Sequence, residues 1–224
     1  LLKSTKNVLF GVFMKNLTLE LIKRGDAIVT SEDIYKIYPE LNENAVQAKI
    51  KRCLKSGELK RLYKGVYSVS QELLKKPVIE ENLAQVIDSE SFLSGLAALR
   101  FYNLIPETIN FKIFTGTKDA KVHSDNMNFE IRKVADDQLR FGIETVKVNG
   151  NNVRIADPVR AVMDTLMEQK LVPQNRRQIC AYFRIDEDEA DTIPWKNAES
   201  YAHRYRNSKM AKKIAAAMSD TGEN

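Results

Sequence analysis

The sequence is poor in the residues that most often form metal and redox sites. It has two cysteines, two histidines and one tryptophan in 224 residues. Cys53 and Cys180 lie far apart, and no histidine is near either of them. The two histidines, His123 and His203, form no H-x-x-x-H pair, so neither has the close partner that a zinc site requires. The sequence therefore predicts no metal site, and two unpaired cysteines favour a reducing cytoplasm.

Motifs that bind phosphate or carry out catalysis are also missing. The sequence contains no G-x-x-x-x-G-K-[ST] loop, no G-x-G-x-x-G turn and no G-x-S-x-G elbow. No apolar run approaches the roughly 20 residues of a membrane-spanning helix. We also find no apolar core followed by the cleavage pattern of a signal peptide. We therefore expect a protein that is not an enzyme, needs no cofactor and does not bind membranes.

One enzymatic alternative stays open, a metal-dependent nuclease. Asp125, Glu130 and Arg132 weakly resemble the acidic and basic cluster of such enzymes. However, the basic member is usually lysine where this chain has arginine, and charged residues alternate along many exposed strands. We therefore predict no catalytic residues.

The composition is that of a folded protein with an uneven distribution of charge. Hydrophobic residues make up 43% and charged residues 29%, which allows one large domain or two ordinary ones. Residues 1–70 carry 13 basic and 7 acidic residues, a net charge of +6. Residues 71–194 carry 16 and 20, a net charge of −4, whereas residues 195–224 carry 6 and 3, a net charge of +3. Basic ends around an acidic middle favour an anionic partner such as nucleic acid.

The first 40 residues predict three short elements. Phenylalanine and leucine repeat on one face of a helix over residues 4–24, and residues 27–29 form a strand-like run. A second helix begins at Thr30 or Ser31, with acidic residues in its first turn. Tyr38-Pro39 then marks a turn, since proline does not fit inside a helix.

A third helix over residues 42–55 is the most informative element. Asn42 is a good N-cap, and Ser56-Gly57 ends the helix. One side carries the apolar stripe Val46, Ile50, Cys53 and Leu54. The opposite side carries Asn44, Gln47, Ala48, Lys51 and Lys55. Residues 59–69 follow as two short strands around a basic turn. This order of elements is typical of a winged helix-turn-helix with a recognition helix and a wing.

The exposed side of this helix has the residue types that read double-stranded DNA. Amide side chains pair with adenine, and lysine reaches guanine or phosphate. We assign Asn44 and Gln47 to bases because the first residues of a recognition helix penetrate deepest. The full set expected to contact DNA is Asn44, Gln47, Lys51, Lys55, Arg61 and Lys64. The alternative is a solvated amphipathic helix beside an ordinary hairpin.

The second part of the chain predicts an α+β domain with a small, mostly antiparallel sheet flanked by helices. We place the winged helix-turn-helix at residues 1–70, a linker at residues 71–79 and this domain at residues 80–224. Asn149-Gly150 predicts a tight turn, and Asp157-Pro158 predicts a helix start. The expected strands cover residues 110–115, 128–134, 143–148 and 153–155. The expected helices cover residues 79–87, 92–102, 157–166, 175–183 and 195–218.

Three short segments carry a resemblance to a known protein family. Residues 64–69 (KGVYSV) have a basic-Gly-Val-Tyr signature at the end of the wing. Residues 94–104 (SGLAALRFYNL) form a serine-led Ala-Leu helix, in which Tyr102-Asn103 replaces the family's usual His-Gly. Residues 155–166 (IADPVRAVMDTL) are similar to a strand-Pro-helix segment that ends in Asp-Leu-Leu. In this order and spacing, the segments resemble the AbiEi family, antitoxins of the type IV toxin–antitoxin systems that act in abortive infection.

The resemblance implies a function for each part of the chain. The winged helix would repress the protein's own operon by binding its promoter, and the second domain would neutralise a cognate nucleotidyltransferase toxin. In type IV systems this neutralisation need not require a stable complex with the toxin. Asp164 matches a family position, and on a packed helix we interpret it as a structural hydrogen-bonding group. The alternative is a winged-helix transcriptional regulator whose second domain senses a ligand or dimerises.

Overall fold

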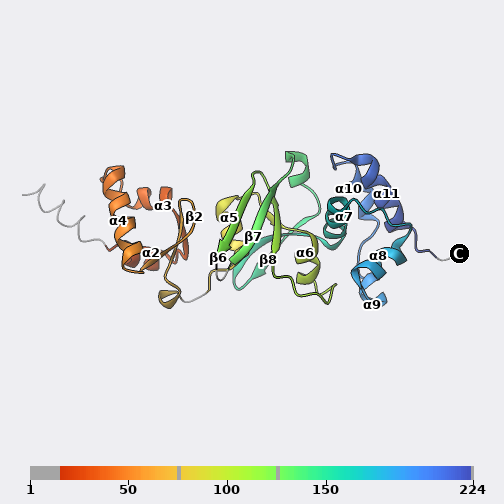
Figure 1. Ribbon diagram of the computed structural model, residues 1–224, viewed down its shortest axis with the longest axis horizontal. Coiled ribbons are helices and arrows are strands. Elements are labelled where there is room, and N and C mark those ends of the chain that lie inside the picture. The colour runs from red at the N-terminus through yellow and green to blue at the C-terminus, as the bar shows by residue number, and fades with distance from the viewer. Residues whose placement is uncertain (1–15, 75–76, 125–126, 223–224) are drawn as a thin grey trace, which may run out of the picture. The chain divides into compact units, whose positions relative to one another are not determined.

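The computed structural model describes residues 16–74, 77–124 and 127–222 as a mixed α+β protein (Figure 1). The chain divides into two compact units, Leu1–Ile87 and Asp88–Asn224. Helix α5 (Glu80–Ile87), which we expected to open the second domain, packs against strand β1 of the first unit. The division therefore lies after α5, not in the segment expected to be the linker. The described residues of that segment include the 3₁₀ turn η1 (Gln71–Leu73).

The first unit has the predicted order of helix, strand, helix, turn, helix and hairpin. Its strands form an antiparallel sheet in the order β1-β3-β2, so the first strand pairs with the last. The part of the first predicted helix before residue 16 lies outside the described residues. The elements are α2 (Leu17–Arg24), β1 (Ile28–Thr30), α3 (Ser31–Ile37), α4 (Glu43–Lys55), β2 (Leu59–Tyr63) and β3 (Val66–Val69).

Local capping residues set the helix boundaries, as the sequence predicted. Thr30 and Asp33 form a reciprocal capping box at the start of α3. Oδ1 of Asn42 accepts a hydrogen bond from the backbone N–H of Ala45 at 2.9 Å and starts α4.

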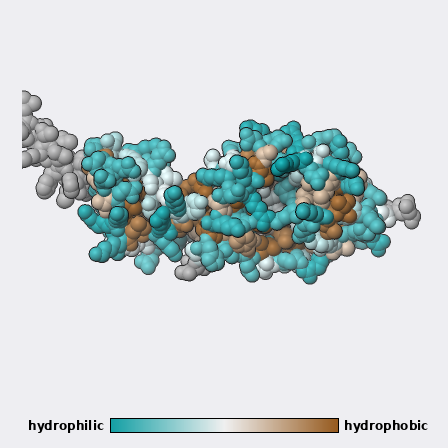
Figure 2. All heavy atoms as spheres, turned by 45° about the horizontal axis from the view of Figure 1, so that its top comes forward, coloured by the Kyte–Doolittle hydropathy of each residue, from teal (hydrophilic) through white to brown (hydrophobic). Residues whose placement is uncertain are grey.

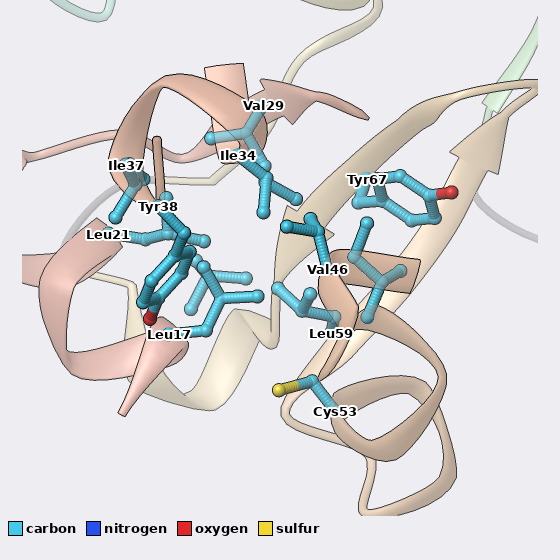
Figure 3. Close-up of a cluster of buried hydrophobic side chains, with 12 residues drawn as sticks. Leu17, Leu21, Val29, Ile34, Ile37, Tyr38, Val46, Cys53, Leu59 and Tyr67 are labelled. Carbon is cyan, nitrogen blue, oxygen red and sulfur yellow. The ribbon is translucent and has the colours of Figure 1, made fainter. Parts of the chain in front are cut away.

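The core of the first unit joins all three of these helices to the sheet (Figure 3). Leu21 from α2, Ile34 from α3 and Val46 from α4 are fully buried. Each such side chain contributes about 1.5–3 kcal/mol by leaving water. Tyr38, at the end of α3, is also buried, and burial raises the pKa of its hydroxyl to about 12. The centroid of its ring lies 4.7 Å from Nζ of Lys49, so a basic side chain of α4 contacts the edge of this core.

The second unit contains a six-stranded mixed sheet rather than the small, mostly antiparallel sheet that we expected. The order is β6-β7-β5-β4-β9-β8, with parallel pairing of β4 to β9 and of β5 to β7. Two strands were not predicted, because β4 has only two residues and β6 lies in a polar stretch. The strands are β4 (Phe92–Leu93), β5 (Lys112–Gly116), β6 (Ala120–Ser124), β7 (Met127–Lys133), β8 (Ile143–Val148) and β9 (Asn151–Ala156).

Helices cover this sheet in layers. Helices α6 (Gly95–Phe101) and α7 (Pro158–Gln169) pack against each other and the sheet, and α10 (Asn197–Ala202) and α11 (Ser208–Ser219) pack on α7 (Figure 1). We expected α10 and α11 to be one helix, but the helix is interrupted at residues 203–207, a segment that we call the 203–207 break. The remaining elements are η2 (Asp136–Leu139), α8 (Arg176–Phe183) and α9 (Glu187–Ala190).

Two local signals in this unit are confirmed. Asn149 and Gly150 both have positive φ angles, 50° and 80°, as a tight turn between β8 and β9 requires. Oδ1 of Asp157 accepts from the backbone N–H of Arg160 at 2.8 Å, and Pro158 is the first residue of α7.

Polar residues cover most of the face shown in Figure 2, with apolar side chains in smaller patches. Among the described helices, none is long and apolar enough to span a bilayer.

Candidate functional site

The segment from Glu43 to Lys64 concentrates positive charge in the first unit, and we call it the basic segment. It carries seven basic and two acidic residues. Within the described part of the chain, none of its basic side chains forms an ion pair. By contrast, Lys23 and Lys36 on the preceding helices each lie within 4 Å of a carboxylate. The basic residues are Lys49, Lys51, Arg52, Lys55, Lys60, Arg61 and Lys64.

The predicted recognition strip faces solvent in the structure. Val46, Ile50 and Cys53 are buried on one side of α4. On the other side, the exposed members of the strip are Asn44, Ala48, Lys51 and Lys55. The strip therefore presents one amide, one methyl group and two ammonium groups to any partner that approaches α4.

Gln47 differs from the other members of the strip because α3 already binds it. It is half-buried, and its Nε2 donates to the hydroxyl of Tyr35 at 2.7 Å. That hydroxyl in turn donates to Oε1 of Glu43 at 3.4 Å. A base contact through Nε2 of Gln47 would have to replace this bond. No local pattern indicates such a bond, because Tyr35 lies on another helix, 12 positions earlier.

The hairpin holds its basic turn in a fixed conformation. Gly65 has a φ of 73°, a left-handed conformation that favours glycine, and its carbonyl accepts from the backbone N–H of Ser31 at 2.8 Å. Lys64 beside it is exposed. Arg61 is also exposed, and its Nε donates to the carbonyl of Tyr63 at 3.3 Å. All six predicted DNA-contacting residues therefore lie within the basic segment, and five of them are exposed.

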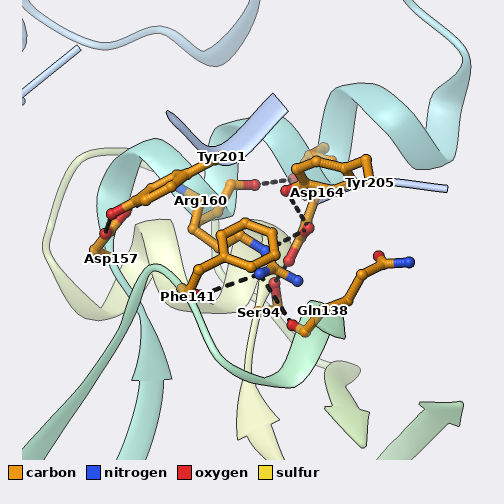
Figure 4. Close-up of polar contacts among 10 residues, drawn as sticks. Ser94, Gln138, Phe141, Asp157, Arg160, Asp164, Tyr201 and Tyr205 are labelled. Atoms are coloured by element: carbon orange, nitrogen blue, oxygen red, sulfur yellow. Dashed lines mark hydrogen bonds and ion pairs between the residues drawn. The ribbon is translucent and has the colours of Figure 1, made fainter. Parts of the chain in front are cut away.

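The second unit contains a buried polar cluster centred on Asp164 of α7 (Figure 4). Oδ1 of Asp164 accepts from Nε of Arg160 at 2.8 Å and from the hydroxyl of Tyr205 at 2.6 Å. Oδ2 accepts from the hydroxyl of Ser94, which precedes α6. Three donors thus occupy most of the acceptor capacity of one carboxylate. This arrangement agrees with the interpretation of Asp164 as a structural hydrogen-bonding group.

Arg160 is the most deeply buried charge in the cluster, with 1% of the residue exposed. Its Nη1 donates to the carbonyls of Gln138 and Phe141, both at 3.1 Å. Its guanidinium carbon also lies 3.9 Å from the ring centroid of Phe141. Burial alone would lower the pKa of Arg160, but the neighbouring Asp164 carboxylate raises that pKa above its ordinary value. Arg160 therefore stays ionised inside the unit.

Asp157 extends the cluster to helix α10, which carries Tyr201. Its Oδ2 accepts from the hydroxyl of Tyr201 at 2.6 Å, and its backbone N–H donates to the carbonyl of Gly142 at 2.9 Å. Gly142 has a φ of 57°, and a Cβ there would lie 2.8 Å from Cβ of Arg160 and 2.9 Å from the Tyr201 ring. Only glycine fits at this position, because backbone and side chains approach it closely.

Two of the three residues considered for a nuclease, Glu130 and Arg132, have structural partners. Glu130 is buried in β7, pairs with Arg132 and lies 3.4 Å from Nζ of Lys121. Arg132 also pairs with Glu168. Asp125 lies outside the described residues. In the part of the chain that the structure describes, no three His, Cys, Asp or Glu residues are grouped to hold a metal ion.

The histidines and cysteines show no reactive arrangement among the described residues. His123 is exposed in strand β6, with Nδ1 2.9 Å from Oδ1 of Asn128. Cys53 is buried and Cys180 half-buried, and both are free thiols. Burial raises the pKa of both thiols, so less reactive thiolate forms at neutral pH.

Comparisons with known proteins add no family to this geometry: no protein-family model matches the chain, and no curated protein shows significant similarity to it.

Replacing Asp164 with alanine should destabilise the second unit by about 3–5 kcal/mol, because it leaves a buried guanidinium without its counterion. Trp195 is the only tryptophan and is buried in this unit. Its fluorescence during urea unfolding therefore reports on the second unit. The control is Glu168→Ala, one turn further along α7, where an exposed ion pair contributes about 0–1 kcal/mol. Equal losses in the two variants would contradict a central role for Asp164.

The stability of the second unit should fall at alkaline pH. Burial, and then the Asp164 carboxylate, raise the pKa of Tyr205 well above its ordinary value. The folded state therefore holds this proton more tightly than the unfolded state. This contribution is complete below about pH 10, the ordinary pKa of tyrosine, and is lost as the pH rises further.

The same tryptophan signal can measure this pH dependence between pH 8 and the alkaline range. Tyr205→Phe removes the titrating group, so the difference in unfolding free energy between the wild type and this variant should narrow as the pH rises above about 10. The control is Tyr182→Phe, whose side chain is exposed. A constant difference between the wild type and Tyr205→Phe would contradict the prediction.

Proposed function

We propose that the first unit is a winged helix-turn-helix that binds double-stranded DNA. Helix α4 would enter the major groove and the β2–β3 hairpin would be the wing. The observation that carries this proposal is the basic segment, with seven basic side chains that lack ion pairs among the described residues. The element order and the pairing of β1 with β3 also agree with a winged helix.

The charges of the basic segment suit the phosphate backbone. Each lysine or arginine that neutralises a phosphate releases condensed counterions, which favours binding and makes it sensitive to salt. Lys55, Arg61 and Lys64 are exposed and fit this role. A solvated helix would also be polar, but seven cations against two carboxylates carry an electrostatic cost that a bound polyanion would remove.

The contacts to bases would come from the start of α4. Asn44 lies in its first turn and is exposed, and a side-chain amide can bond adenine with two hydrogen bonds. Lys51 follows on the same strip and can reach guanine or phosphate. Gln47 would contact a base through its oxygen, or would give up its bond to Tyr35. In the first case its Nε2 keeps the bond to Tyr35 and holds α4 against α3.

We propose, further, that the protein is the cytoplasmic antitoxin of a type IV toxin–antitoxin system. Through the winged helix it would repress its own operon, and through the second unit it would neutralise a cognate nucleotidyltransferase toxin, without requiring a stable complex. The three segments that resemble the AbiEi family support this proposal. Two of them supply Ser94 and Asp164, which are hydrogen-bonded to each other. Asn103, where the family has glycine, has a φ of 59° and keeps the left-handed helix end.

A regulator with a ligand-sensing second domain is the alternative. A cavity in the second unit, beside Arg160, favours it. In that case the DNA-binding part of the proposal would be unchanged.

Replacing Lys55 and Lys64 with alanine should weaken binding to a short DNA duplex and reduce its salt dependence. The slope of log K against log salt should decrease by about 0.9 for each phosphate that the variant no longer neutralises. Fluorescence anisotropy at several salt concentrations measures this slope. The control carries Lys23→Ala and Lys36→Ala, which remove two lysines that lie beside carboxylates on α2 and α3. Equal effects of the two double variants would refute the basic segment as the DNA site.

The two proposed activities should separate in cells. A variant with Lys51, Lys55 and Lys64 changed to alanine should no longer repress a reporter under the protein's own promoter. When it is expressed from an unrelated promoter, it should still protect cells from the adjacent nucleotidyltransferase gene, because the second unit is unchanged. Colony counts and reporter activity measure the two effects. Failure of the wild type to protect would refute the antitoxin function but not DNA binding.

A further inference from the structure

The second unit has a cavity of about 910 Å³ that neither DNA binding nor toxin neutralisation explains. Residues from α6, α7, the β5 and β7 strands and the 203–207 break line it. Its size is at the upper end of the range for small-molecule sites, about 300–1,000 Å³. The floor includes members of the buried cluster, Ser94, Arg160, Asp164 and Tyr205. One part of the cavity lining is therefore polar and held in place by hydrogen bonds.

Two large apolar side chains on the walls are exposed to solvent. Phe111 is 41% exposed and Leu96 is 37% exposed, and both line the cavity. Exposed apolar groups within a concave surface are typical of ligand sites, because a bound molecule can cover them. A flat ring would gain most from contact with Phe111, since aromatic pairs also stack.

The floor offers one hydrogen-bond donor that the protein does not use. Nε and Nη1 of Arg160 are committed to Asp164 and to two backbone carbonyls. Its Nη2 donates to no acceptor among the described residues. A buried guanidinium that is held rigidly on Phe141 and keeps a free donor is suited to an anionic group.

The charges around the cavity also favour an anion. The lining has four basic side chains and two acidic ones, a net charge of +2. Both acids are already engaged, Asp164 by three donors and Glu168 by Arg132. Lys133 and Arg206 are exposed, and neither forms an ion pair among the described residues. They can therefore join Arg160 in binding a carboxylate or phosphate.

We propose that this cavity binds a small molecule with an anionic head and a flat apolar body. The carboxylate or phosphate head would bind Nη2 of Arg160, with Lys133 and Arg206 at the rim. The ring would pack against Phe111 and Leu96. This proposal does not depend on either activity proposed above, since it uses none of the residues of the basic segment. Because the ligand would bind only the folded form, it would also stabilise the second unit.

Three probes test this chemistry on the full chain. Phenyl phosphate has both parts, inorganic phosphate has the anion alone, and benzyl alcohol has the ring alone. Isothermal titration calorimetry should show phenyl phosphate binding at least about tenfold more tightly than either partial probe, a difference of about 1.4 kcal/mol. Benzoate in place of phenyl phosphate tests whether a carboxylate head binds as well. Binding of either aromatic anion supports the proposal.

Matched variants locate the binding. Phe111→Ser and Arg206→Gln alter exposed cavity residues, so the fold should be kept, and each should weaken phenyl phosphate binding at least about fivefold. The controls are Phe101→Ser, which is 39% exposed and does not line the cavity, and Arg177→Gln, which is exposed elsewhere on the unit. Circular dichroism confirms folding of all four. No binding of either aromatic anion, or equal weakening by cavity and control variants, would overturn the proposal.

Discussion

The buried ion pair of Arg160 and Asp164 is the interaction on which the second unit depends. Moving two charges out of water costs more than their attraction returns unless hydrogen bonds complete the site. Here the guanidinium also donates to two backbone carbonyls, and the carboxylate also accepts from two hydroxyl groups. These partners come from the start of α6, the η2 loop and the break before α11. One charged pair on α7 thereby holds together segments that are distant in sequence. Arg160, whose Nη2 has no acceptor among the described residues, also lines the cavity.

In the first unit, by contrast, the basic side chains of the basic segment are not paired with carboxylates in the part of the protein that the structure describes. Its core is mostly apolar and joins three helices to a small sheet. Seven basic residues are gathered between Glu43 and Lys64 without ion pairs among the described residues. One unit thus contains a charge that is neutralised inside the protein, within a large apolar core. The proposed activity of the other comes from charges left for a partner outside.

Features set by neighbouring residues could be predicted from the sequence, and features set by distant residues could not. The capping residues Thr30, Asn42 and Asp157 act within one turn, and the helices begin where these residues predicted. The break at residues 203–207 has no such signal. It places the hydroxyl of Tyr205 on Asp164, 41 positions away. The two-residue strand β4 and the bond from Gln47 to α3 were missed for the same reason. The members of the predicted recognition strip are exposed, except Gln47, which this bond holds half-buried.

The distance along the chain between Asp164 and its partners has a consequence for synthesis on the ribosome. Ser94 is made 70 residues before Asp164, and Tyr205 follows 41 residues after it. The first unit can form its core as soon as it emerges, whereas Arg160 has no complete site until Tyr205 has left the exit tunnel. At the roughly 5–20 residues per second of translation, α7 therefore stays for seconds without α10 and α11, the helices that pack on it. Over that interval the apolar side of α7 is open to other chains, and aggregation competes with folding of the second unit.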